Sequence, residues 1–313
     1  MILRSDILLL DVGGTFIKCC DGRCIPMPSG GSREEIAHSL RQAVAGLVRS
    51  GTEVRGADSF TPSGECTPDF SVGPQSPAIG VAIPGPFDYA QGIFLMKHKF
   101  AAVYGESFRA LAGLPESTDI RFMHDVVAAL QGCLASTDGA GTKPAAPVSP
   151  AAETALVTLG TGLGFAHTEN GRVQTGTNGS PARSIYNRPW HDGILEDAAS
   201  ARGIRAAYAR LSGRSDLSAA HIATLAQNGD EAALQTFSDL GQTLGEALAP
   251  LLEELHIGTL LLAGQVSQSL PLFERPLRNA LEGIDIRLAP KGAVFQGLAT
   301  LFDTPETLQS LQS

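Results

Sequence analysis

The sequence predicts an α/β protein made of two similar halves, each with a mixed β-sheet and flanking helices. Two glycine-containing turns, residues 11–15 and 158–164, each follow a run of apolar residues that is typical of a buried strand. In both halves a strand and its hairpin partner precede further strands and helices, as in an α/β fold. A glycine turn after a strand directs backbone N–H groups towards a phosphate. Two such turns, one in each half, therefore predict a duplicated fold that binds a nucleoside triphosphate in a central cleft.

The first half begins with short strands and a helix. Ser32 and the glutamates that follow it are typical of a helix start, and apolar residues then recur at helical spacing. The expected elements are, in order, the strand Ile7–Asp11, its hairpin partner Thr15–Cys20, a third antiparallel strand Arg23–Pro28, the helix from Ser32, the strand Ala78–Ile83, the strand Arg121–His124 and a helix that begins at Asp125.

The second half repeats this plan. Its expected elements are the strand Leu156–Leu159, the hairpin continuation Gly162–His167, the helices Ile194–Leu211 and Ala232–Glu254, the strand Thr259–Leu262 and a terminal helix Ala293–Leu301. Two segments rich in proline and glycine are predicted to lack regular structure. Thr61–Pro77 is expected to be a surface loop, and Asp138–Pro150 is expected to separate the halves.

Length, composition and charge narrow the class of protein. The 313 residues suffice for two domains, and 43% hydrophobic with 18% charged residues is a globular composition. The net charge of -9 disfavours nucleic acid or an anionic membrane as a partner. No apolar stretch approaches the roughly 18 residues of a membrane span, and the apolar run near the start is too short for a signal peptide. We therefore expect a cytoplasmic protein.

The cysteines and histidines do not predict a metal site. The 5 cysteines form neither a disulfide framework nor a Cys-x-x-Cys zinc pattern, and no spacing among the 7 histidines favours metal binding. Buried cysteines that behave as small hydrophobic residues are the better interpretation.

Asp11 lies at the end of the first strand, beside the turn that contains Gly13 and Gly14. A carboxylate there can hold Mg²⁺ through water while the turn amides and the Thr15 hydroxyl contact phosphate. The alternative is a hairpin turn in which Asp11 accepts hydrogen bonds from backbone N–H groups. The second glycine turn favours the phosphate site. Lys18 either faces the same phosphates or lies on a solvated strand edge, and both remain open.

Two further carboxylates follow strands or begin helices. Asp125 starts a helix directly after a strand, where it is either an N-cap or the general base that takes the proton of an attacking hydroxyl. An N-cap can serve both purposes, because the helix amides hold the carboxylate in place. Glu196 lies in a first helical turn, where the helix dipole favours any glutamate. Its functional alternative is a hydrogen bond to a polyol hydroxyl.

Taken together, these segments resemble the ROK family of sugar kinases, within the actin, hexokinase and Hsp70 superfamily. The resemblance covers nearly the whole chain, through seven motifs in the family's order. These are the first phosphate motif at 7–18, the "GIPGPVD" turn at 80–88, "NDANAA" at 124–129, the second phosphate motif at 159–164, "GCLEAYAS" at 193–200, "A-x-x-GD-x-x-A" at 226–233 and "VLGGGVS" at 261–267.

The resemblance implies a fold and a division into domains. It implies the two-domain actin-like ATPase (ribonuclease H-like) fold, with a mixed five-stranded sheet in each domain. The smaller N-terminal domain would span residues 1–125 and the larger C-terminal domain 126–313, with the last helix, about 293–303, able to return to the N-terminal domain. It also suggests a homodimer.

The resemblance also implies roles for individual residues. Asp125 would be the catalytic base, Glu196 a sugar ligand and Gly85 a contact behind the sugar. Asp11 would hold the Mg²⁺ of MgATP. The residues implied to bind the nucleotide are Gly13, Gly14, Thr15, Lys18, Thr161 and Gly162 at the phosphates, and Gly264 and Gln265 near the adenosine.

The chain departs from the family pattern at the sugar. His124 stands where the family has Asn before the catalytic Asp, and Ser180 and Arg183 replace the Glu and His of "AGExGH". We expect these three positions to contact the substrate and to change the preferred sugar, because a buried polar site rejects a ligand that leaves its groups unpaired. Arg183 would favour an acidic or anionic sugar. The zinc motif "CxCGxxGC" is replaced by Ile185–Asp192, so no zinc is expected.

The sequence thus predicts an ATP-dependent kinase of a sugar or sugar derivative, similar to glucokinases and hexokinases. A polyphosphate-dependent glucokinase is a close alternative, since residues 158–164 also resemble those enzymes and Gln265 departs from the glycine-rich adenosine motif. A catalytically silent sugar-binding regulator is a second alternative, favoured by the altered sugar motif. No helix-turn-helix segment precedes the first strand, which disfavours a repressor.

Overall fold

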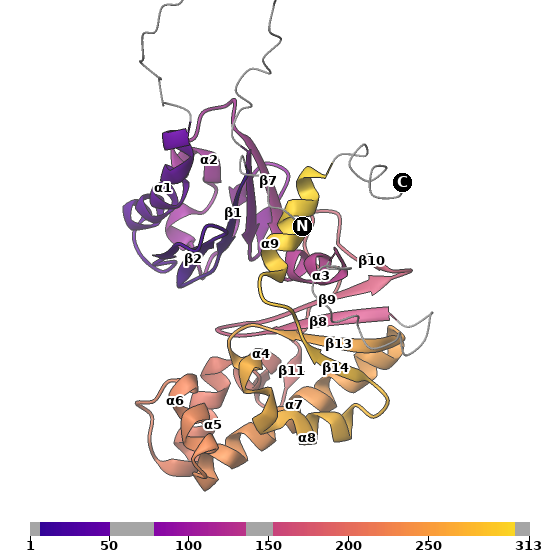
Figure 1. Cartoon of the computed structure of the whole chain (residues 1–313). Helices are drawn as coiled ribbons and strands as arrows, with labels where there is room; N and C mark the ends of the chain where they lie inside the picture. Colours follow the sequence, from indigo (N-terminus) through magenta and orange to yellow (C-terminus); the bar gives the residue numbers. More distant parts are fainter. Residues whose placement is uncertain (1–6, 51–77, 136–152, 304–313) are drawn as a thin grey trace, which may run out of the picture. The chain divides into compact units, whose positions relative to one another are not determined.

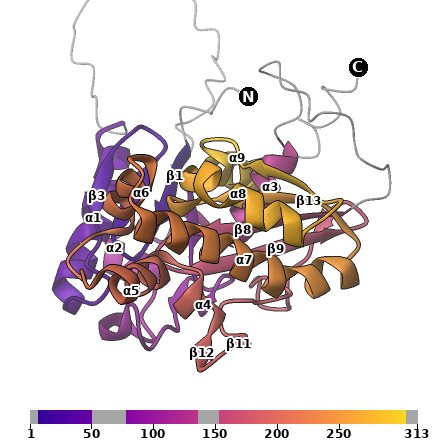
Figure 2. The same ribbon diagram turned by 90° about the horizontal axis from the view of Figure 1, so that it is seen from below.

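The computed structural model describes residues 7–50, 78–135 and 153–303. The chain divides into two compact units, Met1–Met123 and His124–Ser313 (Figures 1 and 2). This division falls close to the boundary predicted after residue 125, and before the segment Asp138–Pro150. Both that segment and the predicted loop Thr61–Pro77 lie outside the described residues.

The sheet of the first unit has five strands in the order β3-β2-β1-β4-β7. β1 is paired antiparallel with β2 through Val12 and Ile17, and parallel with β4 through Ile7 and Ala78. The central strand β1 is buried on both faces, since the successive residues Leu8, Leu9 and Leu10 are all buried, and its apolar run is typical of such a strand. The bounds are β1 Ile7–Val12, β2 Phe16–Cys19, β3 Cys24–Pro26, β4 Ala78–Ile83 and β7 Asp119–His124.

The predicted first helix is α1, Arg33–Ser50. The Ser32 backbone N–H donates to Glu35 Oε2 at 2.8 Å, and the Glu35 N–H donates back to Ser32 Oγ at 3.3 Å. This capping box fixes where the helix begins. The remaining elements of the unit are β5 Phe87–Asp88, β6 Ile93–Phe94, η1 Ala101–Val103 and α2 Phe108–Ala112.

The sheet of the second unit has the same plan, in the order β10-β9-β8-β13-β14. β8 is antiparallel to β9 and parallel to β13, and β13 is parallel to β14. Each unit therefore has a three-stranded antiparallel start followed by two further strands, and the predicted α/β fold with two five-stranded mixed sheets is confirmed. The bounds are β8 Glu153–Leu159, β9 Leu163–Glu169, β10 Arg172–Val173, β13 Ile257–Ala263 and β14 Asp285–Leu288.

The second unit also contains most of the helices. They are α3 Asp125–Ala135, α4 Leu195–Ala198, α5 Ala201–Ser212, α6 Ala219–Gln227, α7 Glu231–Glu254, α8 Leu270–Ala280 and α9 Ala293–Ala299, with the short η2 Val266–Ser269 and η3 Thr300–Phe302. A small hairpin joins β11 Pro189–Trp190 to β12 Gly193–Ile194. Sequence patterns indicated neither α8 nor β14.

The helix predicted over Ile194–Leu211 is wrong as one element. The chain forms α4 and α5 separately, because Ser200 is extended with φ -140° and ψ 177°. The Ala201 N–H donates to the carbonyl of Gly160 at 2.8 Å, a bond across the fold that a continuous helix would not make. The apolar spacing runs through this break, so periodicity alone could not show it.

Helices α3 and α9 are in backbone contact within the second unit (Figure 1). A Cβ at Gly132 would overlap the carbonyl oxygen of Ala293, and a Cβ at Gly297 would overlap that of Ala128. Glycine is therefore required at both positions for this close approach. The last helix packs on α3 here, and its return to the N-terminal domain stays a prediction.

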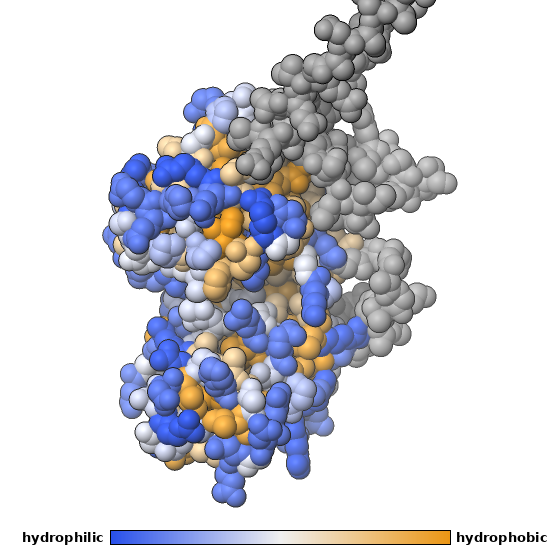
Figure 3. Space-filling view, turned by 60° about the vertical axis from the view of Figure 1, so that its left-hand side comes forward, coloured by the Kyte–Doolittle hydropathy of each residue, from blue (hydrophilic) through white to orange (hydrophobic). Residues whose placement is uncertain are grey.

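The surface is predominantly polar on the face shown in Figure 3, where hydrophobic residues form separate patches. Among the described residues, the large hydrophobic side chains that stay exposed are Phe16, Leu95 and Tyr104 in the first unit and Tyr186, Leu211, Leu234 and Leu288 in the second. Scattered exposure of this kind is normal for a folded domain. No helix among the described residues has the length and hydropathy needed to cross a bilayer.

Candidate functional site

In the first unit, the glycine turn between β1 and β2 is closed by its own backbone. The Gly13 N–H donates to the carbonyl of Phe16 at 2.9 Å. A Cβ at Gly14 would lie 3.2 Å from Ser29 Oγ and 3.7 Å from Lys99 Cδ, so the glycine allows a close approach of the loop beside it. Thr15, at the tip of the turn, is exposed. The turn therefore presents backbone groups and the Thr15 hydroxyl to solvent, while Gly14 packs against the loop that carries Ser29 and against the stem of Lys99.

Two lysines lie near this turn. Lys18 Nζ is 3.4 Å from Asp11 Oδ2, and the side chains are 56% and 19% exposed respectively. The stem of Lys99 packs against Gly14. Lys99 was missed by sequence reasoning, because it belongs to none of the motifs. The basic run around it, Lys97-His98-Lys99, was the one available signal.

Gly85 lies in the turn between β4 and β5. The Gly85–Pro86 peptide bond is cis. The turn is held by the Tyr89 hydroxyl, which donates to the carbonyl of Ile83 at 3.1 Å, and by the Leu95 N–H, which donates to the carbonyl of Pro86 at 3.2 Å.

In the second unit, Asp125 is the first residue of α3. Its neighbour Val126 is fully buried and packs on Gly164, where an added Cβ would lie 3.4 Å from Val126 Cβ. The same Cβ would overlap Thr158 Oγ1. Gly164 follows the second glycine turn directly, so the helix start that carries Asp125 lies against the beginning of β9. The structure thus places the start of α3, which carries Asp125, against the strand that follows the second glycine turn.

His124 and Asp125 are in direct contact. His124 Nδ1 is 2.7 Å from Asp125 Oδ1, which also accepts from the Val126 N–H at 2.7 Å. The Val126 N–H also lies 3.3 Å from His124 Nδ1, a bond that would require Nδ1 to be unprotonated. The shorter contact, between a ring N–H and a carboxylate, is the stronger, and we assign the proton to Nδ1. His124 therefore orients the Asp125 carboxylate.

The turn 160–163 is held from three sides. Gly160 N–H donates to the carbonyl of Gly162 at 3.1 Å, and the Gly160 carbonyl accepts from Ala201. The Leu163 N–H donates to Glu196 Oε2 at 2.9 Å. Thr161 is exposed at the tip. As in the first unit, the turn presents backbone and a hydroxyl to solvent.

The predicted adenosine turn lies beside it. Gly264 has φ +93°, and a Cβ there would overlap the carbonyl oxygen of Leu159, the residue that precedes the turn 160–163. The Ser267 hydroxyl donates to the Gly264 carbonyl at 2.6 Å and is fully buried. Gln265 is exposed next to it. The ends of β8 and β13 therefore bring both turns to one edge of the sheet.

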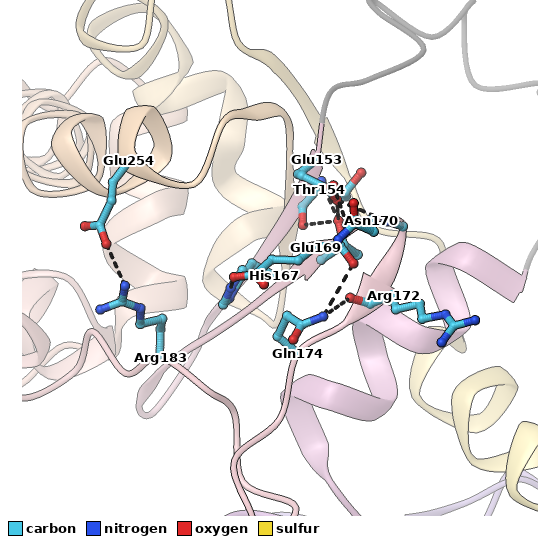
Figure 4. A network of polar contacts seen from close by, with 11 residues as sticks. Glu153, Thr154, His167, Glu169, Asn170, Arg172, Gln174, Arg183 and Glu254 are labelled. Carbon is cyan, nitrogen blue, oxygen red and sulfur yellow. Dashed lines mark hydrogen bonds and ion pairs between the residues drawn. The ribbon is translucent and has the colours of Figure 1, made fainter.

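The structure does not bring Arg183 to this edge. Arg183 Nη2 donates to Glu254 Oε1 at 2.6 Å, and Figure 4 shows the two side chains directed at each other. Glu254 ends α7 just before β13 begins, at Ile257, which pairs with Glu153 at the amino end of β8. The glycine turn leaves the other end, roughly 20 Å away for a strand of this length. Ser180 lies in a separate turn, where its carbonyl accepts from Gly176 N–H at 2.8 Å.

A charged network surrounds the start of β8 and the β9–β10 turn, also shown in Figure 4. Glu153 accepts from Thr168 Oγ1 at 2.5 Å and from Asn170 N–H at 2.6 Å. Burial alone would raise the pKa of Glu153, but these hydrogen bonds lower it below its ordinary value. His167 is 1% exposed beneath them, with Nε2 3.6 Å from Glu169 Oε1, and burial lowers its pKa.

No group of three or more His, Cys, Asp or Glu side chains that could hold a metal occurs within the described ranges. A Mg²⁺ ion bound mainly by phosphate oxygens and water needs only one or two protein carboxylates, and Asp11 beside the first turn fits that donor set. Within the stretch Ile185–Asp192, Pro189–Trp190 form β11. Trp190, His191 and Asp192 line a groove of about 560 Å³ together with residues of β12, α4, α5 and α7.

The sequence and the fold were compared with those of known proteins. The sequence model of the ROK family matches residues 148–293. A ROK family glucokinase from Streptomyces griseus, solved with glucose and AMPPNP, has a TM-score of 0.66 and 20% identity, covering 94% of this chain and 98% of its own. No curated protein shows significant similarity to this chain.

Two further structures correspond to the alternative functions. An inorganic polyphosphate/ATP-glucomannokinase from Arthrobacter sp. strain KM has a TM-score of 0.60 and 18% identity, covering 98% of this chain and 99% of its own. A ROK family transcriptional regulator, a homologue of the E. coli MLC protein, has a TM-score of 0.62 and 18% identity, covering 94% of this chain and 77% of its own. At such identities the structures establish the shared fold. Together with the family match over residues 148–293, they confirm the resemblance of this chain to the ROK family.

Proposed function

We propose that this protein is a sugar kinase that transfers the γ-phosphoryl group of ATP to a hydroxyl of a sugar or sugar derivative. The observation that carries the proposal is the position of Asp125. Its helix start packs through Val126 onto Gly164, which supports a site that combines Asp125 with the glycine turn before Gly164. A general base and a phosphate site are the two groups that phosphoryl transfer to an alcohol requires.

In the proposed step, Asp125 accepts the proton of the sugar hydroxyl as its oxygen attacks the γ-phosphorus. A new P–O bond forms to the sugar, the bond between the γ-phosphorus and the β-phosphate oxygen breaks, and ADP leaves with that electron pair. His124 Nδ1–H and the Val126 N–H hold Oδ1 of the base at 2.7 Å each. Asp125 is thereby fixed in one orientation before substrate arrives, which lowers the cost of reaching the reactive geometry.

The nucleotide residues are proposed from both glycine turns. In the second unit, Thr161 and Gly162 would bind phosphate, and Gly264 and Gln265 would lie near the adenosine. In the first unit, Gly13, Gly14 and Thr15 would bind phosphate, with Lys18 and Lys99 supplying positive charge. Asp11 would hold Mg²⁺, which when bound neutralises phosphate charge.

The substrate class is a neutral or amino sugar rather than an anionic one. Arg183, which the sequence offered as a partner for an acidic group, is paired with Glu254 at the opposite sheet edge from Asp125. His124 is a positioning residue for Asp125 in this proposal, and Gly85 stays a proposed contact behind the sugar.

The test is ATP consumption across a panel of hexoses, amino sugars and N-acetyl sugars, repeated with polyphosphate as the donor. We expect ADP and a sugar phosphate in equal amounts with at least one sugar. Turnover with polyphosphate but not with ATP would show that polyphosphate, rather than ATP, is the phosphate donor. Nucleotide binding without turnover on any sugar would favour a regulator, a role to which the ROK transcriptional regulator of similar fold gives support.

A further inference from the structure

The break between α4 and α5 contacts both ends of the glycine turn 160–163. The Ala201 N–H, the first of α5, donates to the Gly160 carbonyl at 2.8 Å. Glu196, in the first turn of α4, accepts the Leu163 N–H on Oε2 at 2.9 Å. Two short elements more than 30 residues along the chain thus fix the carbonyl that opens the turn and the amide that closes it.

The second oxygen of Glu196 is also bonded. Arg202 Nη2 donates to Glu196 Oε1 at 3.2 Å and lies 2.6 Å from Asp197 Oδ1. Asp197 Oδ2 in turn accepts the Ile194 N–H at 3.3 Å. The Glu196 side chain is only 19% exposed, whereas that of Arg202 is 53% exposed. Glu196 is therefore held on both oxygens by groups of its own unit.

We propose that Glu196 is a positioning residue that holds the turn 160–163 in its phosphate-binding form, and that its contribution is to nucleotide binding rather than to sugar binding. This inference rests on the proposed kinase function. The resemblance implies a sugar contact for Glu196, whereas the observed bond of its carboxylate is to a backbone amide of the turn 160–163. Such a hydrogen bond to a charged group is among the stronger ones.

Arg202 has a second effect in this arrangement. Two carboxylates beside a phosphate turn would repel a triphosphate, and the Arg202 guanidinium lies on both of them and offsets part of that charge. Without Arg202, Glu196 would keep its bond to Leu163 but would present more negative charge to the nucleotide. Loss of Arg202 should therefore weaken nucleotide binding in a salt-dependent manner, with little change in the turn itself.

The experiment compares Glu196→Ala and Glu196→Gln with the matched control Glu246→Ala, an exposed helical glutamate bonded to Gln242. Two quantities are measured: hydrogen exchange of the peptide containing residues 160–163 in the protein alone, and the Kd of AMPPNP by calorimetry. We expect Glu196→Ala to speed exchange at Leu163 and to raise the nucleotide Kd about tenfold. Glu196→Gln should restore most of both, since its amide oxygen still accepts the N–H.

The KM for the sugar distinguishes this proposal from a direct sugar contact of Glu196. The proposal requires the KM for ATP to rise in Glu196→Ala while the KM for the sugar stays within about twofold. A rise in the sugar KM with an unchanged nucleotide Kd would overturn it, as would unchanged exchange at Leu163. If the wild-type protein binds no nucleotide, the kinase function and the nucleotide part of this inference both fail, and exchange alone still decides whether Glu196 holds the turn.

Discussion

The two units share one strand order but hold their glycine turns in different ways. The first turn is closed by its own backbone, with lysine side chains beside it. The second is braced by other elements, through the α5 amide and the Glu196 carboxylate, and the helix start bearing Asp125 packs against it. The same strand order thus supports a turn with two lysines beside it in one unit and, in the other, a turn next to the helix that begins at Asp125. The two sheets have the same strand order, and the side chains next to each turn make the difference between them.

We expect the largest effect from the substitution Asp125→Asn, which tests whether the general base lies in the second unit. If the base lies in the second unit, the variant should lose about 10² to 10⁴-fold in kcat, with an AMPPNP Kd within about twofold of wild type. Steady-state kinetics and calorimetry measure the two quantities, and Asp216→Asn, at an exposed position, is the control. If Asp125→Asn keeps its turnover, Asp125 is not the general base.

The close packing of α9 on α3 predicts a large effect on stability. Gly132→Ala places a Cβ on the backbone of Ala293, and should lower the free energy of unfolding of the second unit by about 1–3 kcal/mol. The sole tryptophan, Trp190, lies in that unit and reports its unfolding in urea. Gly30→Ala, where an added Cβ meets nothing within 4 Å, serves as the control. Equal midpoints for the two variants would show that the contact is not tight.

The cation-rich character of the first turn is tested by Lys99→Ala. We expect the nucleotide Kd to rise roughly fivefold, with a weaker dependence on salt, because one positive charge near the phosphates is lost. Lys97→Ala is the matched control, since Lys97 Nζ lies over the Tyr104 ring at 5.7 Å. If Lys99→Ala and Lys97→Ala have a similar nucleotide Kd, Lys99 has no specific role in nucleotide binding.

The smallest expected effect is a pH dependence of the stability of the second unit, which contains His167. Burial lowers the pKa of His167 below its ordinary 6.5, so the unfolded chain takes up a proton near pH 6.5 while the folded unit does not. Stability is therefore full above about pH 6.5 and falls as the pH drops towards the lower folded-state pKa. Urea midpoints followed by Trp190 fluorescence should decline between pH 7 and 5.

The decline should be reduced in His167→Phe and unchanged in His38→Gln, an exposed histidine of the first unit. A pH dependence that is identical in His167→Phe would assign it to other groups. Glu153, whose pKa is also lowered, acts at more acidic pH, where its stabilisation is lost as the pH falls through its folded-state pKa.

Much of the frame could be predicted from the sequence, because it depends on local patterns. The apolar runs before the glycine turns became β1 and β8, and the hairpins that follow became β2 and β9. The α4–α5 break could not be predicted, since it depends on a bond from Ala201 to Gly160 across the fold. The Arg183–Glu254 pair joins residues 71 apart in sequence, and no spacing rule detects it. Lys99 was missed for the same reason.

The backbone contact between Gly132 and Gly297 has a consequence for the order in which the protein is made. The helix that carries Asp125 is synthesised before the midpoint of the chain, yet its partner α9 emerges from the ribosome more than 150 residues later. At roughly 5–20 residues per second, that interval lasts on the order of ten seconds or more. A nascent chain therefore completes the packing of α3, the helix that begins at Asp125, only when residues 293–299 have been released, and premature termination upstream of them yields a product in which α3 lacks this partner.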